Sequence, residues 1–204
     1  MLTRHTHAHE GGLVVFHIGM TIQRPHRPDL WMPVFLAMPP MLTELHRNRD
    51  AAARGEAEDL GFLGASTLLG GKGPWVVQYW RTVDHLYAYA KNQDLAHVPA
   101  WRRFNQAARR HPGAVGIWHE TYVVPEGGVE TFYGNGASVG LAEATGMVDA
   151  GSGTGDARQR LSARPRGNAA CRPRAMRYTH NGQPKTSTWT SGETSVSPAP
   201  NSRI

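Results

Sequence analysis

The sequence predicts an α+β domain in which helices cover one face of an antiparallel sheet. Strand-like and helix-like segments follow one another in the order β-α-β-β-α-β, and an extra strand follows the last of them. This order is the split βαβ pattern of a ferredoxin-like fold. The composition changes sharply near Gly151, after which no run of periodic apolar residues remains. We therefore expect a flexible arm at residues 1–11, the domain at residues 12–150 and a disordered basic tail at residues 151–204.

The domain is predicted to begin with a strand and an interrupted helix. Residues 13–22, LVVFHIGMTI, are rich in β-branched and aromatic residues and form the first strand. From Leu30 onward apolar residues recur at helical spacing, and Pro39 and Pro40 interrupt them. This pattern predicts two short helices, or one kinked helix, ending near Arg47.

A hairpin is expected next. Residues 48–59 are charged and alanine-rich, which favours a connection on the surface. The runs LGFLGASTLL at residues 60–69 and WVVQYWR at residues 75–81 are the next two strands, and the glycines between them favour a turn.

The second half of the domain repeats the alternation of helix and strand. Thr82 is a suitable N-cap for a helix over residues 83–92. Another helix, over residues 99–110, has a proline at its first position, where a missing N–H costs no helical hydrogen bond. A strand at residues 116–124 and the extra strand at residues 129–133 complete the order.

The strand GIWHETYVV, residues 116–124, is apolar on both faces. Alternation places His119 on one face and Glu120 on the other, so these two side chains cannot form a touching acid–base pair. The strand WVVQYWR also carries apolar residues on both faces. Because an isolated sheet would expose this surface to water, we expect its second face to pack against another copy of the chain. The prediction is a C2 homodimer with a closed, barrel-like and water-poor interior.

Charge and cysteine content restrict the partners and the compartment. Residues 151–204 hold nine Lys/Arg and two Asp/Glu, a net charge of +7, whereas residues 1–150 hold thirteen and fourteen, a net charge of −1. A domain whose net charge is close to zero is not expected to recognise a specific nucleic acid. Cys171 is the single cysteine, and no apolar run is long enough to cross a bilayer. We therefore expect a cytoplasmic protein with no membrane partner.

Sequence motifs for common cofactors are missing. The chain has no GxGxxG after a strand, no P-loop, no HExxH and no CxxC, so nicotinamide, ATP and structural zinc have no support. No metal site is expected, because His5, His7 and His9 lie in an arm that supplies no fixed coordination geometry. Haem would need an axial ligand, for which His97 or His119 could serve.

Residues 78–105 are the stretch richest in Trp, Tyr, His and Arg, which is typical of a pocket for an apolar ligand with one polar group. Trp80 and Trp101 could line such a pocket, or they could be packing residues. Arg81 could bind an anion, or it could form a surface ion pair with Asp84.

Two histidines are candidates for a general base, because histidine titrates near neutrality. His97 is expected on the loop before Pro99, where it could act as a base or cap the following helix. His119 lies within a strand that would fix its ring, and it could be catalytic or structural.

Six stretches of the sequence together carry a family resemblance. They are FHIGMTIQRP, MPVFLAMPPML, GPWVVQYWR, HVPAWRRFN, VGIWHETYVV and ETFYGN. In this order they resemble an uncharacterised bacterial and fungal family related to antibiotic-biosynthesis-type monooxygenases, within the dimeric α+β barrel superfamily. The resemblance covers residues 13–148.

The resemblance implies a monooxygenase that acts on a small, largely apolar, electron-rich compound of polyketide, terpenoid or aromatic type, without flavin or metal. Such chemistry needs a base, a dry cavity and donors for an oxyanion, because the substrate anion itself passes an electron to O2. His97 or His119 would be the base, and Arg81 would be the anion partner. The walls around the substrate would be Trp80, Trp101, Trp118 and Tyr122.

Two alternatives remain open at this point. One is a haem-dependent oxygenase or an aldoxime-dehydratase-like enzyme on the same scaffold. The other is a non-catalytic ligand-binding or dimerisation module, in which the interior is filled by the protein's own side chains.

Overall fold

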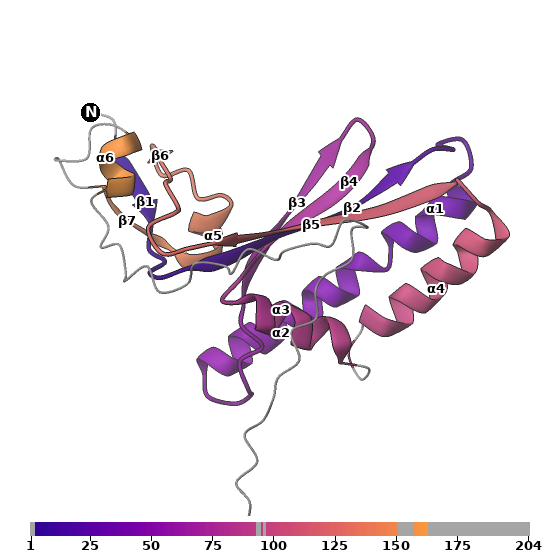
Figure 1. Ribbon diagram of the computed structural model, residues 1–204, viewed down its shortest axis with the longest axis horizontal. Coiled ribbons are helices and arrows are strands. Elements are labelled where there is room, and N and C mark those ends of the chain that lie inside the picture. Colours follow the sequence, from indigo (N-terminus) through magenta and orange to yellow (C-terminus); the bar gives the residue numbers. More distant parts are fainter. Residues whose placement is uncertain (1–2, 93–94, 96, 151–156, 163–204) are drawn as a thin grey trace, which may run out of the picture. The chain divides into compact units, whose positions relative to one another are not determined.

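The computed structural model of the chain describes residues 3–92, 95, 97–150 and 157–162 (Figure 1). Most of the tail predicted at residues 151–204 therefore lies outside the described residues. Within that range the structure describes one short helix, α6 (Ala157–Ser162).

Four antiparallel strands form the main sheet. They are β2 (Leu13–Ile22), β3 (Phe62–Gly70), β4 (Gly73–Trp80) and β5 (Val115–Val124). Their order across the sheet is β3-β4-β2-β5, with helices in the chain between β2 and β3 and between β4 and β5. This arrangement confirms the predicted ferredoxin-like fold.

Two helices follow β2, in agreement with the interrupted pattern. They are α1 (Pro28–Phe35) and α2 (Met38–Ala53). Pro39 and Pro40 lie in the first turn of α2, where backbone N–H groups have no partner within the helix. The two prolines therefore mark the beginning of a helix rather than a break within one.

Helix α2 continues past Arg47, its predicted end, to Ala53. The expected surface connection is thus helical over residues 48–53, because alanine has the highest helix propensity. Gly55 follows the end of the helix with a φ of 74°, and its N–H donates to the carbonyl oxygen of Ala52. A glycine in this left-handed conformation is the common way to end a helix.

Helix α3 (Val83–Lys91) begins as predicted, because the Thr82 side chain accepts a hydrogen bond from the backbone N–H of His85. Helix α4 (His97–Arg110) begins two residues before its predicted start. His97 is therefore a helical residue, and its expected position on a loop was wrong. Pro99 still lies in the first turn, where its missing N–H costs no helical hydrogen bond.

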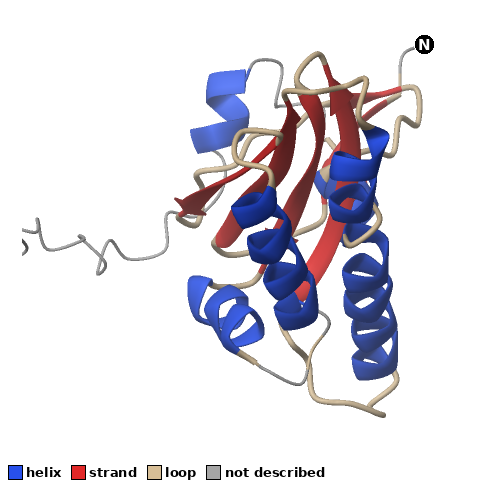
Figure 2. Cartoon of the chain, turned by 90° about the vertical axis from the view of Figure 1, so that its right-hand side faces the viewer, coloured by secondary structure: helices blue, strands red, loops and turns tan. Residues whose placement is uncertain are grey.

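Helices α1 to α4 cover one face of the main sheet (Figure 2). Trp80 is the largest fully buried side chain, and its Nε1–H donates to Oε1 of the buried Gln78 at 2.9 Å. This buried bond satisfies both polar groups. The core cluster around Trp80 consists of Val14, Leu45, Phe62, Leu86 and Tyr89.

A separate three-stranded sheet has the order β6-β1-β7. Its strands are β1 (Arg4–His7), β6 (Tyr133–Gly134) and β7 (Met147–Asp149). The predicted flexible arm thus contains a paired strand, and the predicted extra strand is reduced to β6, outside the main sheet. His7 is 1% exposed, with its Nδ1 2.7 Å from the Thr131 hydroxyl. These long-range partners stabilise a segment that looks too polar to fold.

The face of the main sheet opposite the helices is partly covered. The short helix α5 (Leu141–Thr145) packs against β3, where the missing side chain of Gly64 leaves room for it. Further along, Gly19 lies between Trp75 and Trp118, and an added Cβ would come within 2.6 Å of Trp75. This face therefore carries a compact aromatic surface.

Candidate functional site

An open cavity of about 820 Å³ lies between the helix-covered face of the main sheet and helices α1 to α4. Its size is in the range of sites for small organic ligands. Most of the surface is apolar. The apolar lining residues include Phe16, Ile18 and Met20 of β2, Val34 and Phe35 of α1, Met38, Met41 and Leu42 of α2, Val76 of β4, Leu86 of α3, Phe104 of α4 and Ile117 of β5.

One row of directly opposed residues crosses the sheet beneath the cavity. Thr67 of β3 is opposite Val76 of β4, Val76 is opposite Ile18 of β2, and Ile18 is opposite His119 of β5. All four residues line the cavity. The row is thus polar at both edges of the sheet and apolar in the two central strands.

His119 lies on the edge strand β5, with its ring centroid 5.8 Å from that of Phe16. Among the described residues its ring nitrogens have no hydrogen-bond partner. Because this residue is exposed, water can reach its ring when no ligand is present. Both nitrogens are therefore available to a molecule in the cavity, as a proton acceptor or as a donor.

Helix α2 contributes a polar stripe to the cavity. Thr43, His46, Arg47 and Asp50 all line it, at the i, i+3, i+4 and i+7 spacing of one helix face. Thr43 donates to the carbonyl oxygen of Pro39 at 2.9 Å. Residues at this spacing usually face either the core or the solvent, and here they border an apolar cavity.

His46 is the second histidine of the cavity, and it was not among the predicted site residues. Its ring stands edge-on to that of Phe62, with centroids 5.1 Å apart. Burial lowers the pKa of His46 from its ordinary value of 6.5, and the nearby positive charge of Arg49 lowers it further, against the opposing effects of Asp50 and Glu143. His46 is therefore neutral at neutral pH.

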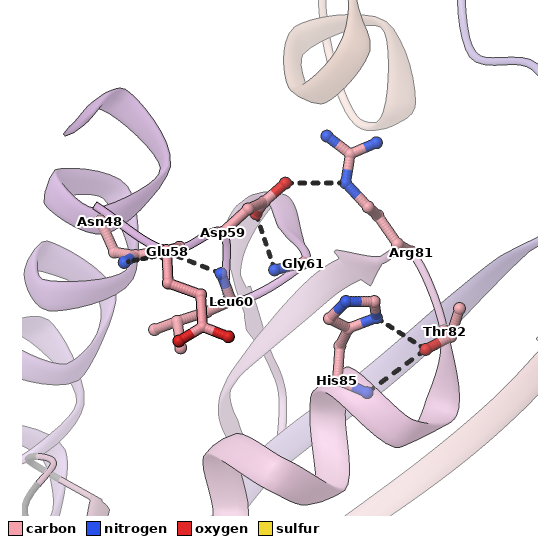
Figure 3. Close-up of polar contacts among 8 residues, drawn as sticks. All are labelled: Asn48, Glu58, Asp59, Leu60, Gly61, Arg81, Thr82 and His85. Atoms are coloured by element: carbon pink, nitrogen blue, oxygen red, sulfur yellow. Dashed lines mark hydrogen bonds and ion pairs between the residues drawn. The ribbon is translucent and has the colours of Figure 1, made fainter. Parts of the chain in front are cut away.

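Arg81, the predicted anion partner, does not line the cavity. Its Nε donates to Oδ2 of Asp59 at 3.0 Å, and Oδ1 of Asp59 accepts from the backbone N–H of Gly61 at 2.7 Å (Figure 3). The same loop is anchored to α2, because Asn48 donates to the carbonyl oxygen of Glu58. Arg81 thus holds the connection between α2 and β3. Its partner is Asp59 and not Asp84.

The predicted aromatic walls lie elsewhere. Trp80 is in the core and is absent from the cavity lining, while Trp118 and Tyr122 point to the opposite face of the sheet by strand alternation. There the Tyr122 hydroxyl donates to Oε2 of Glu120 at 2.6 Å, and its ring packs edge-on against His17. The structure therefore separates these aromatic residues from His119.

His97 and Trp101 lie on α4, but their side chains are outside the described part of the structure. Their proposed roles stay predictions. Phe104, one helical turn beyond Trp101, does line the cavity. Helix α4 therefore takes part in the site.

The cavity also contains residues that the sequence analysis missed. In α2, the apolar pattern drew attention to the leucines and methionines, and the stripe of Thr43, His46, Arg47 and Asp50 resembled a solvent face. One feature of the sequence could have indicated this part of the site. His46 lies in a polar stripe that borders the apolar positions Met41, Leu42 and Leu45.

No three His, Cys, Asp or Glu side chains within the described part of the chain are grouped so that they could hold a metal ion. No helix described here has the length and apolar character needed to cross a membrane.

Comparison with known proteins gives one family and one curated relative. The family model described as "Monooxygenase af470-like" matches residues 13–141. Monooxygenase af470 of Aspergillus fumigatus is 30% identical to this chain over 145 residues, which make up 64% of this chain and 46% of that protein. The chain thus spans about half the length of this relative.

Solved structures show a weaker likeness. A Bacteroides thetaiotaomicron protein described as a possible oxidoreductase is 7% identical, with 55% of this chain and 97% of that one covered and a TM-score of 0.36. A dimeric Bacteroides fragilis protein of ferredoxin-like fold is 12% identical, with coverage of 53% and 96% and a TM-score of 0.30. The fold assignment does not depend on these likenesses, because the strand order alone establishes it.

Proposed function

We propose that this chain, which belongs to the Monooxygenase af470-like family, binds a small, largely apolar, electron-rich compound in the cavity beneath α1 to α4 and oxygenates it there. The family match confirms the resemblance to monooxygenases expected from the six sequence stretches. The observation that carries the proposal is the cavity itself, which combines an apolar lining of suitable size with the side chain of His119.

The proposed reaction needs neither flavin nor metal. His119 takes the proton from an acidic O–H of the substrate, and the resulting anion passes one electron to O2. The radical pair then joins through a new C–O bond, and the O–O bond breaks with loss of water to leave a carbonyl group. For 1-naphthol the balance is one naphthol and one O2 giving one 1,4-naphthoquinone and one water.

The cavity supports this chemistry in two ways. A substrate bound against its apolar lining would displace water there, and the resulting anion would be less stabilised by water and more reactive. The edge position of His119 brings an imidazole, which can accept a proton through a ring nitrogen, to the border of that lining. Arg81 has no part in this scheme, because Asp59 already binds it outside the cavity.

The aromatic face on the other side of the sheet supports a homodimer. Tyr122 is exposed on this face, Trp75 and Trp118 are half-buried, and a second copy of the chain would bury what remains of their surface. In this arrangement each subunit keeps its own cavity on the helix side. Sedimentation should show a dimer that Trp118→Arg dissociates, whereas Leu69→Arg at the exposed hairpin tip leaves it intact. A monomeric wild-type protein would contradict the dimer.

Oxygen uptake with 1-naphthol tests the proposed reaction. Wild-type protein should consume O2 and form naphthoquinone in equal amounts, with no haem or flavin absorbance. His119→Asn should slow turnover by about 100-fold or more, since that is the usual contribution of a general base. His26→Asn, at an exposed histidine outside the cavity, is the matched control. Turnover that survives His119→Asn unchanged would remove His119 from its role.

A further inference from the structure

We infer that the cavity is built for an elongated ligand with a polar group at each end: an anionic group such as a carboxylate beside α2, and a hydrogen-bonding group beside His119. This inference rests on the proposed function, because it describes the ligand of the same cavity. It adds the length of that ligand and the positions of its polar groups.

The length follows from the register of the sheet. Thr67 and His119 occupy the two edge strands of one row, with Val76 and Ile18 between them. Neighbouring strands lie about 4.8 Å apart, so the two polar ends of the row are separated by about 14 Å. A ligand that contacts both ends must therefore cross the whole width of the sheet.

The middle of the cavity accepts only apolar groups. Val76 is 2% exposed and Met20 is 7% exposed, and neither offers a hydrogen bond. A polar ligand group placed over them would lose its hydrogen bonds to water without replacement, which weakens binding. Polar groups of the ligand are therefore confined to the ends.

The end beside α2 favours an anion. Helix α2 packs against β3, with His46 against Phe62, and Arg47 of this helix lines the same cavity as Thr67. Asp50 of this helix is already paired with Arg49 at 2.9 Å, whereas Arg47 has neither an ion pair nor a hydrogen bond within the described part of the chain. His46 is neutral at neutral pH and adds an N–H donor without a charge. Arg47 is thus the group at this end that can bind a carboxylate.

The end beside β5 favours a hydrogen bond without a charge. His119 and Thr121 line the cavity here, and neither is a permanent cation. A hydroxyl group of the ligand could donate to a ring nitrogen of His119, which is also the geometry required for removal of its proton. The two ends are therefore distinct, and the ligand has one preferred direction.

Binding of two twelve-carbon acids to the full chain tests this inference. Isothermal titration calorimetry would compare dodecanoate with 12-hydroxydodecanoate, whose extended length is close to the span of the row. A cavity that is merely apolar prefers dodecanoate, because a terminal hydroxyl lowers hydrophobicity. A cavity with a second polar end reverses this order, and we expect 12-hydroxydodecanoate to bind at least about threefold more tightly, the effect of one hydrogen bond.

Two variants assign the ends. His119→Phe should restore the preference for dodecanoate, because it keeps a ring but removes the hydrogen bond. Arg47→Met should weaken both acids by about tenfold without changing their order, since each loses the same charged contact. Arg110→Met, at an exposed arginine of α4 outside the cavity lining, should change nothing.

The outcomes separate this inference from the proposed function. Tighter binding of dodecanoate to the wild type, or unchanged affinities in Arg47→Met, would overturn the inference and leave the cavity as an apolar site. Absence of binding by either acid would overturn the inference together with the cavity as a ligand site. Normal binding in a protein that takes up no oxygen with 1-naphthol would leave the inference standing and count against the proposed reaction alone.

Discussion

Ile18 of β2 lies directly opposite His119 of β5 in the antiparallel ladder of the main sheet. The proposed base is therefore held by regular backbone pairing rather than by a loop, and its position is fixed relative to the apolar floor of the cavity. Sites on regular elements are more precise than sites on loops. Both residues line the cavity, which lies on the helix side of one chain.

The pKa of His46 predicts a pH-dependent stability. Because folding lowers this pKa, the folded chain binds fewer protons than the unfolded chain between the lowered value and 6.5. Stability should therefore fall as pH drops through 6.5 and level off below the folded pKa. His46→Phe, which keeps a ring against Phe62, should gain stability relative to the wild type as pH falls from about 8 to about 5. Thermal unfolding of both proteins across this range measures the difference, and a constant difference would contradict the assignment.

Arg81 and Asp59 should behave as a structural ion pair. Each is exposed at the surface, so loss of the pair should cost less than about 1 kcal/mol, as judged by a double-mutant cycle with Arg81→Met and Asp59→Asn. Neither variant should slow oxygen uptake. A large loss of turnover in Arg81→Met alone, with Asp59→Asn unaffected, would return Arg81 to the role of anion partner.

Trp80 should contribute to stability and not to ligand binding. Trp80→Phe leaves a void in the core and removes the donor to the buried Gln78, so we expect a loss of about 2–4 kcal/mol in the free energy of unfolding. Chemical denaturation measures this loss. The folded variant should bind dodecanoate with unchanged affinity, and a clear weakening would place Trp80 at the cavity wall after all.

Gly61 and Gly55 form a matched pair on the connection after α2. Both have a positive φ, 77° at Gly61 and 74° at Gly55. An added Cβ at Gly61 would clash with the His85 ring, whereas an added Cβ at Gly55 would meet no atom within 4 Å. Gly55→Ala should therefore cost about 1–2 kcal/mol for its backbone conformation alone. Gly61→Ala should cost clearly more, because the His85 ring must also move. Chemical denaturation measures the free energy of unfolding of both variants. Equal losses would mean that the His85 ring moves at no cost.

Most of the fold could be predicted from the sequence, because alternation and helical spacing are local signals. The four strands of the main sheet begin and end within two residues of their predicted positions. The main differences arose where the deciding contact is distant in the sequence. Arg4–His7 becomes a strand only because β6 and β7, more than a hundred residues later, pair with it.

The site was harder to predict than the fold. Alternation correctly separated His119 from Glu120, but it could not say which of the two faces the helices cover. The structure contains a cavity under the helices of one chain, and the expected chamber between two subunits stays a prediction. Aromatic richness also pointed to Trp80 and Trp118, whose bulk serves the core and the opposite face.

Adjacent valines of β4 offer the most direct test of the cavity as the ligand site. Val76 lines the cavity, whereas Val77 points to the other face of the same sheet. In a methyl-labelled sample titrated with 1-naphthol, the methyl resonances of Val76 and Ile18 should shift in a saturable manner, and those of Val77 should stay in place. Saturable shifts of Val77 with Val76 and Ile18 unchanged would put the ligand on the opposite face and contradict the account.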